Sequence, residues 1–115
     1  MIEPYQFTIS EASELIQEGK LSPVALVQSV LGRIDLLEPS LKAWVTIDKV
    51  GALENAERSE NEIKIKGPRS ALHGIPIGIK DIYYTMGVPT TACSLVYSNF
   101  VPTYDATAVV LLKKS

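Results

Sequence analysis

The sequence has little of several residues and patterns that would assign a protein to a class. Its 115 residues include one cysteine, Cys93, so no disulfide can form within the chain, and a reducing compartment is the simpler expectation. There is one histidine, His73, and neither residue has the paired spacing of zinc ligands. No apolar run approaches the ~20 residues of a membrane helix, and residues 1–5 lack a signal-peptide pattern. We therefore expect a cytoplasmic protein with no metal and no cofactor.

The chain also lacks an excess of charge of either sign. Its net charge is -2, and charged residues make up 21% of the sequence against 46% hydrophobic residues. This balance is typical of a globular protein and gives no electrostatic footprint for nucleic acid or an anionic membrane surface. We accordingly predict neither as a partner. The length suits one domain and is too short for two.

Two helices are predicted near the start of the chain from their capping residues. Thr8 and Glu11 fit a capping box, and Gly19 is a suitable residue to end the helix that follows. Ser22 with Pro23 begins a second helix, which residues 38–39 (Glu-Pro) should stop. Both segments have apolar residues at helical spacing, so each should bury one face.

The rest of the chain reads as alternating short strands and helices. Residues 43–47 (AWVTI) and 75–80 (IPIGIK) are short apolar runs that predict buried strands. Asp48 can cap a surface helix running to about residue 63, and Asp105 can cap a last helix from Ala106. Helices placed between strands favour the α/β class.

The residue that points most directly to chemistry is Lys80, at the end of the glycine-spaced run 72–81 (LHGIPIGIKD). Read plainly, it is a strand-end lysine whose amine reaches water. The functional interpretation is a base, because burial disfavours the ammonium form and leaves a lysine able to accept a proton. The residues alone leave both interpretations open.

Other sites fit less well. A phosphate loop needs four residues between its glycines and a lysine directly after the second, whereas three residues separate Gly74 from Gly78 and Ile79 precedes Lys80. His73 is better explained as a loop histidine bonded to backbone, and Cys93 as a small buried side chain. Nothing in the spacing joins them as a catalytic pair.

Three segments resemble the amidase signature family, in the family's order and spacing. Residues 71–81 (ALHGIPIGIKD) resemble its lysine segment, residues 87–94 (GVPTTACS) the turn that follows, and residues 104–110 (YDATAVV) the start of the next helix. The opening pair of helices, which includes residues 33–35 (RID), is also similar. The resemblance covers essentially the whole chain.

The resemblance implies a catalytic role for Lys80. The family hydrolyses or transfers carboxamides with a Ser-cisSer-Lys triad, in which Lys80 would be the neutral base. Asp81, Thr91 and Ser94 would be supporting residues around it, and the substrate of the complete enzyme would be a small carboxamide. The implied fold is α/β: amphipathic helices packed on part of a mixed β-sheet, with residues 1–115 forming the N-terminal part of a single amidase-signature domain.

The chain departs from the family pattern in two respects. It contains no Gly-Ser-Ser-Gly-Gly run, the segment that carries both catalytic serines of the family, so we expect this chain alone to be inactive. Ile82 stands where the A subunits of amidotransferases usually have asparagine, which favours a general amidase by analogy. Two alternatives remain: half of a split amidase or amidotransferase A subunit completed by another chain, and a non-enzymatic interaction module or decayed gene product. Unpaired sheet edges would favour a complementary chain or self-association.

Overall fold

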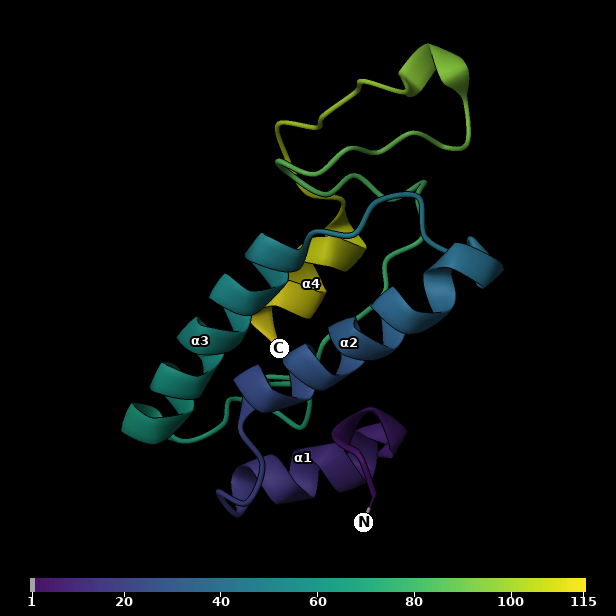
Figure 1. The fold of residues 1–115 in the computed structure, drawn as a ribbon. Coiled ribbons are helices and arrows are strands. Elements are labelled where there is room, and N and C mark those ends of the chain that lie inside the picture. Colours follow the sequence, from purple (N-terminus) through teal and green to yellow (C-terminus); the bar gives the residue numbers. More distant parts are fainter. Residues whose placement is uncertain (1) are drawn as a thin grey trace. The chain divides into compact units, whose positions relative to one another are not determined.

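The structure is a computed structural model that describes residues 2–115. The elements are two short 3-10 helices, η1 (Pro4–Gln6) and η2 (Leu95–Tyr97), and four α-helices, α1 (Ile9–Gln17), α2 (Pro23–Leu41), α3 (Lys49–Lys66) and α4 (Thr107–Lys114) (Figure 1). The chain divides into two compact units. Unit 1 extends to Lys42 and resumes over residues 49–76, and unit 2 consists of residues 43–48 and 77–115.

Unit 1 is built on helices whose beginnings the sequence predicts correctly. The Thr8 N–H donates to Glu11 Oε2 at 2.7 Å and the Glu11 N–H donates back to Thr8 Oγ1 at 3.3 Å, which completes the capping box of α1. Gly19, with φ +70°, ends that helix. Ser22 Oγ accepts the Ala25 N–H at 3.2 Å at the start of α2. These caps satisfy backbone donors that a helix leaves unpaired at its N-terminus.

The predicted end of α2 is wrong by two residues. The helix continues through Pro39 to Leu41, and Lys42 follows in the left-handed conformation with φ 49°. Proline removes one N–H from the helix, but the next turn is still closed because the Lys42 N–H donates to the Glu38 carbonyl at 2.9 Å. The loss of a single bond near the end of a long helix is therefore tolerated.

The core of unit 1 lies where its three α-helices meet. Ala12 and Ile16 of α1 are buried against Leu26 of α2, and Ile63 of α3 and Ile75 pack on the same cluster. Because these side chains recur at helical spacing, each helix contributes one apolar stripe to the core. Helix α2 packs against α1 and α3, as the ribbon shows (Figure 1).

The predicted α/β class is wrong for the part of the chain that the structure describes. No strand occurs in residues 2–115, and both predicted strands, 43–47 and 75–80, are irregular chain. A strand exists only when a neighbouring strand accepts its ladder of hydrogen bonds, and the run 75–80 is also interrupted by Pro76 and Gly78. With no sheet among these residues, association through sheet edges also lacks a basis.

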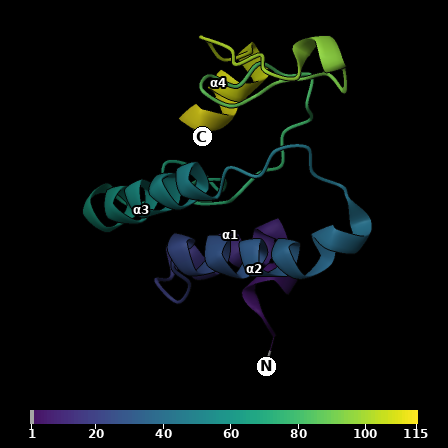
Figure 2. The same cartoon turned by 45° about the horizontal axis from the view of Figure 1, so that its top comes forward.

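Unit 2 is mostly loop around the short helix α4. The chain runs out to η2 and returns (Figures 1 and 2), and the two arms are joined because Thr90 N–H donates to the Phe100 carbonyl at 3.0 Å and Gly87 N–H to the Pro102 carbonyl at 3.1 Å. The Tyr84 ring lies 5.3 Å from the Phe100 ring. Val109 of α4 and Pro102 are the only buried apolar side chains of unit 2 among the described residues. Polar contacts therefore carry much of the order in this unit.

Helix α4 begins at Thr107, one residue later than predicted. Its N-cap is Ala106, which has no side-chain cap, so the predicted capping by Asp105 is wrong. The Asp105 carboxylate instead accepts the Met86 N–H at 2.7 Å and pairs with Lys113 at 2.7 Å. These two donors lower the pKa of Asp105, with the Lys113 hydrogen bond as the larger cause. A residue read as a local cap therefore joins two distant parts of unit 2.

Candidate functional site

Lys80 lies at the start of a turn, and its side chain is exposed. Its carbonyl accepts the Tyr83 N–H at 3.1 Å, so the backbone turns immediately after it. Its ammonium group forms neither an ion pair nor a hydrogen bond with any part of the chain from residue 2 to residue 115. The expected burial by a strand and its neighbours is therefore absent here, and the amine is free to approach another group.

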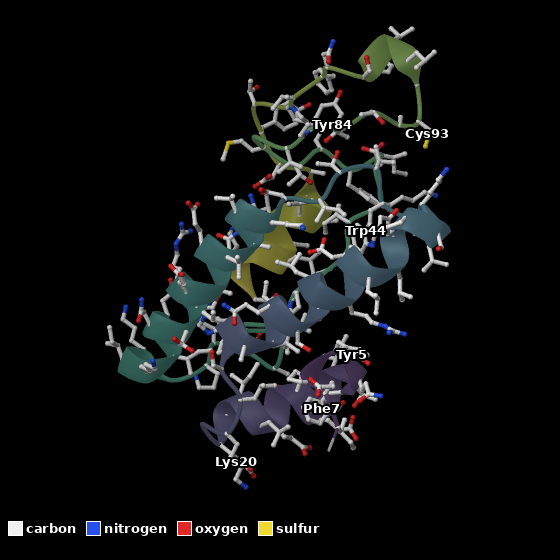
Figure 3. The ribbon with its side chains drawn as sticks, viewed as in Figure 1. Tyr5, Phe7, Lys20, Trp44, Tyr84 and Cys93 are labelled. Atoms are coloured by element: carbon white, nitrogen blue, oxygen red, sulfur yellow. The ribbon has the colours of Figure 1, made fainter. Side chains whose placement is uncertain are left out.

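Two glycines before Lys80 are required by close neighbours. A Cβ on Gly78 would lie 2.9 Å from the outer edge of the Trp44 ring, which is labelled in Figure 3. Gly74, in unit 1, has φ +87°, and a Cβ there would lie 2.8 Å from Pro23 Cγ. In both cases the atoms that a Cβ would meet belong to side chains. The two glycines of the run therefore reflect local packing, in unit 1 at Gly74 and in unit 2 at Gly78.

The residue after Lys80 is the centre of a hydrogen-bonded clamp. One carboxylate oxygen of Asp81 accepts the Thr91 N–H at 2.8 Å, and the other accepts the Thr91 hydroxyl. The Asp81 carbonyl also accepts the Ala92 N–H, at 2.8 Å. The Thr91 hydroxyl, followed by the Thr91 N–H, lowers the pKa of Asp81, because both donors favour the charged carboxylate. We refer to Asp81, Thr91 and Ala92 as the Asp81 clamp.

The turn at the far side of the clamp has an uncommon backbone. Ala92 and Cys93 are consecutive residues with positive φ, 49° and 55°. This left-handed conformation costs about 1–2 kcal/mol for a residue with a Cβ, so other interactions must hold it. The Cys93 N–H donates to Thr91 Oγ1 at 3.3 Å, and the Ser94 N–H to the Thr91 carbonyl at 2.9 Å. The clamp supplies those interactions.

The structure therefore brings together three of the residues named from the sequence. Asp81 and Thr91 are in direct contact, and Ser94 follows in the same turn as the N-cap of η2. The side chain of Ser94 makes no capping bond there. What sequence reasoning missed is the pair of left-handed residues, since neither Ala92 nor Cys93 is a residue type that signals such a conformation. The supporting roles of Asp81, Thr91 and Ser94 in catalysis remain predictions.

His73 is a structural histidine, which confirms the interpretation as a loop residue bonded to backbone. It is buried, its Nδ1 accepts the Arg69 N–H at 3.1 Å, and its Nε2 lies 3.1 Å from Glu62 Oε2. Because Nδ1 accepts, we assign the proton to Nε2, which then donates to the carboxylate. Burial lowers the pKa of His73, the positive charge of Arg69 adds to this, and Glu62 opposes it. Glu62 also pairs with Arg69.

The remaining candidates, Cys93 and His73, belong to different units. Cys93 is exposed, so its interpretation as a buried side chain was wrong, and Figure 3 labels it in the loop of unit 2, whereas His73 belongs to unit 1. Residues 2–115 contain no group of three His, Cys, Asp or Glu side chains that could hold a metal ion. No helix in that range is both long and apolar enough to cross a membrane.

Comparison with known proteins places these residues in a family. The amidase family profile matches residues 25–115, which include Lys80, Asp81 and Thr91. The chain is 44% identical over 114 residues to the A subunit of the glutamyl-tRNA(Gln) amidotransferase from Syntrophus aciditrophicus (strain SB), covering 99% of this chain and 23% of that protein. It is 43% identical over 109 residues to the protein of the same name from Roseiflexus sp. (strain RS-1), covering 95% of this chain and 22% of the relative.

A third relative, from Myxococcus xanthus (strain DK1622), carries that name too and is 41% identical over 108 residues, covering 94% of this chain and 22% of the relative. The chain thus spans less than a quarter of the length of these relatives. The family match nevertheless takes in most of the chain, including all of the motifs around Lys80. The chain belongs to the amidase family.

Proposed function

We propose that this chain supplies the catalytic lysine, Lys80, of an amidase-signature enzyme that cleaves the C–N bond of a carboxamide. The observation that carries the proposal is the exposed, unpaired Lys80 amine directly before the Asp81 clamp, within the family match. A surface lysine with no task has no need of a rigid backbone behind it. Residues 1–115 would be the N-terminal part of a single amidase-signature domain.

In this proposal Lys80 acts as a base through two serines. The neutral amine accepts the proton of a bridging serine, which accepts the proton of the serine nucleophile. The nucleophile attacks the carbonyl carbon, backbone N–H groups stabilise the oxyanion, and the C–N bond breaks. The proton returns to the leaving nitrogen, which departs as ammonia or an amine and leaves an ester on the serine. Water then hydrolyses the ester, so the steps consume one carboxamide and one water.

The two serines would have to come from elsewhere than this sequence. Its 115 residues contain no Gly-Ser-Ser-Gly-Gly run, and the chain matches only 22–23% of the relatives' length. We therefore propose that residues 1–115 alone have no amidase activity. Detection of carboxamide hydrolysis in a verified 115-residue preparation, abolished by Lys80→Ala, would overturn this point.

We infer that the enzyme belongs to the amidotransferase branch of the family. The relatives from Syntrophus, Roseiflexus and Myxococcus are all named as the A subunit of a glutamyl-tRNA(Gln) amidotransferase. Ile82 had favoured a general amidase, but its side chain is half exposed and takes no part in the hydrogen bonds of the clamp. Whole-segment similarity therefore outweighs one departure at a position outside the clamp.

Exposed apolar side chains favour a complementary polypeptide as a partner. Leu95 and Val96 of η2 are 93% and 87% exposed, while the only buried apolar side chains among the described residues of unit 2 are Val109 and Pro102. A patch of this kind on a protein surface marks an interaction site. In the proposed enzyme its occupant would be the remainder of an amidase-length polypeptide, whether continuous with this segment or a separate chain.

A chimera tests the proposal. The chain would replace the 114-residue segment that it matches in the Syntrophus relative, and amide release and transfer would be measured in that protein's own assembly. Lys80→Met should abolish activity, because it keeps the side chain's length and removes the amine. Lys66→Met, at an exposed lysine at the end of α3, is the matched control and should retain it. A fully active Lys80→Met chimera would contradict the proposal.

A further inference from the structure

We propose that Asp81 is a positioning residue for Lys80, and that Thr91 enables this role by occupying the Asp81 carboxylate. The inference rests on the proposed function of Lys80. It concerns how the backbone beside Lys80 is held, so that a partner group can reach the lysine amine.

The backbone on the C-terminal side of Lys80 is fixed at three points within two residues. The Lys80 carbonyl accepts the Tyr83 N–H at 3.1 Å, the Asp81 carbonyl accepts the Ala92 N–H at 2.8 Å, and the Asp81 side chain accepts the Thr91 N–H at 2.8 Å. A lysine side chain is a flexible four-carbon stem with a compact charge at its end. With no ion pair to steer the amine, the anchored backbone is what sets the region that it can reach.

Thr91 also keeps the Asp81 carboxylate away from the lysine next to it. Neighbouring Lys and Asp side chains can pair with each other, and such a pair would hold Lys80 in its charged form. Here one oxygen of Asp81 takes the Thr91 N–H and the other takes the Thr91 hydroxyl. Because Thr91 is buried, this arrangement persists without competition from water on its side. The carboxylate is therefore engaged, and the Lys80 amine stays unpaired.

The strained turn is consistent with a positioning role. Ala92 and Cys93 both occupy the left-handed region, and their backbone N–H groups point to the clamp: Ala92 to the Asp81 carbonyl, Cys93 to Thr91 Oγ1. A chain adopts two such residues in succession only when the surrounding bonds over-determine it. The clamp thus fixes the Lys80 segment and the 91–94 turn together, as one rigid piece of unit 2.

The first test uses nuclear magnetic resonance on the 115-residue chain. In Asp81→Asn one oxygen becomes an NH2 group that cannot accept, so one of the two Thr91 donors loses its partner. We expect amide exchange at Thr91, whose N–H the carboxylate accepts, to speed up at least 10-fold, and the Lys80 amide and side-chain signals to show increased motion. Asp105→Asn is the matched control. It should speed up exchange of the Met86 amide, whose N–H donates to Asp105, and leave exchange at Thr91 and the motion of Lys80 unchanged. Unchanged exchange and motion in Asp81→Asn would overturn the inference.

The second test measures kcat and KM in the chimera, per folded molecule. Misplacement of a catalytic group by about 1 Å costs on the order of 100-fold, so Asp81→Asn and Thr91→Val should lower kcat 10- to 100-fold with little change in KM. Thr91→Ser, which restores the hydroxyl, should recover most of the activity that Thr91→Val loses. If Asp81→Asn changes only the folded fraction and leaves kcat unaltered, Asp81 is a stability residue and the inference is wrong.

The two proposals fail in different ways. An active Lys80→Met chimera would remove the proposed function, and the positioning role with it. An inactive Lys80→Met chimera with an Asp81→Asn variant of full kcat would remove the positioning role alone.

Discussion

The buried histidine of unit 1 allows a sharp prediction about stability. His73 joins the end of α3 to the turn at residues 69–74, with Nδ1 accepting the Arg69 N–H and Nε2 facing Glu62. We consider two substitutions of the same pair, His73→Gln and Glu62→Gln. The first removes a buried ring and its Nδ1, the acceptor for the Arg69 N–H, and places the glutamine amide oxygen one atom further along the side chain. The second leaves an amide oxygen that can still accept from Nε2.

The environments of the two residues decide which substitution costs more. The His73 side chain is 1% exposed, whereas that of Glu62 is 40% exposed. Loss of the acceptor for this part-buried N–H costs up to about 1–3 kcal/mol, and lost packing of the buried ring adds to it. At Glu62 water replaces the lost partner, and an exposed ion pair such as the one with Arg69 contributes little. We therefore expect His73→Gln to destabilise the chain clearly and Glu62→Gln much less.

The pH dependence gives the same prediction a second measurement. The folded-state pKa of His73 lies below 6.5, its value in an unfolded chain, so the folded state favours the neutral ring. Its contribution to stability is complete above pH 6.5 and is lost as the pH falls through the folded-state value. Glu62, whose own pKa is lowered chiefly by Arg69, opposes the shift at His73. Glu62→Gln should therefore make the loss larger and extend it to lower pH, and His73→Gln should abolish it.

Urea unfolding followed by circular dichroism at several pH values between 5 and 7.5 measures these effects, since α1, α2 and α3 supply most of the helical signal. The aspartates and glutamates with lowered pKa titrate below this window, so they do not interfere. Equal stability of the two variants, or a pH dependence that persists in His73→Gln, would refute the assigned roles of Nδ1 and Nε2.

Three further predictions concern the loops. Because the folded-state pKa of Asp81 lies below 3.8, the protection of the Thr91 amide, which the carboxylate binds, should be complete above pH 3.8 and fall as the pH drops below it, as hydrogen exchange would show. Ala92→Gly should raise the free energy of unfolding by up to about 1 kcal/mol, since glycine relieves the strain of φ 49°. Ala52→Gly inside α3 should lower it by about 1 kcal/mol, and equal effects of the two substitutions would contradict backbone strain at Ala92. Gly74→Ala should cost at least about 1 kcal/mol more stability than Gly67→Ala in urea unfolding. Both glycines have positive φ, but only at Gly74 would the added Cβ lie 2.8 Å from the Pro23 ring. A similar cost at both sites would argue against that contact.

The helices of unit 1 could be predicted because their signals are local. Thr8 caps α1 through its own third neighbour, and Ser22 does the same for α2, so a few adjacent residues decide the outcome. The predicted end of α2 is wrong because Pro39 alone does not decide it. The hydrogen bond from the Lys42 N–H to the Glu38 carbonyl closes one more turn after the proline. The strands at 43–47 and 75–80 were wrong for a different reason: a strand depends on a partner that no local pattern specifies.

The candidate site was predicted only in part. The residues themselves indicated Lys80 but left its plain interpretation open, and the family resemblance gave Lys80 its catalytic role and added Asp81, Thr91 and Ser94. The contact between Asp81 and Thr91 spans ten residues of irregular chain, and no periodicity reports a contact of that kind. The same holds for Asp105, whose position before α4 predicted a cap although its partners are Met86 and Lys113.

The reason for this difference lies in how each unit is held together. Unit 1 has an apolar core, and apolar spacing is visible in a sequence because it must follow the helical period. Among the described residues, unit 2 buries only Val109 and Pro102 of its apolar side chains, and two carboxylates, Asp81 and Asp105, bind backbone N–H groups far along the chain. Such hydrogen bonds depend on specific geometry and leave no periodic pattern in the sequence. In the proposed enzyme, the clamp would hold the backbone beside Lys80 while leaving its side chain exposed, which is the combination that this lysine needs if its amine is to meet a serine from another part of the polypeptide.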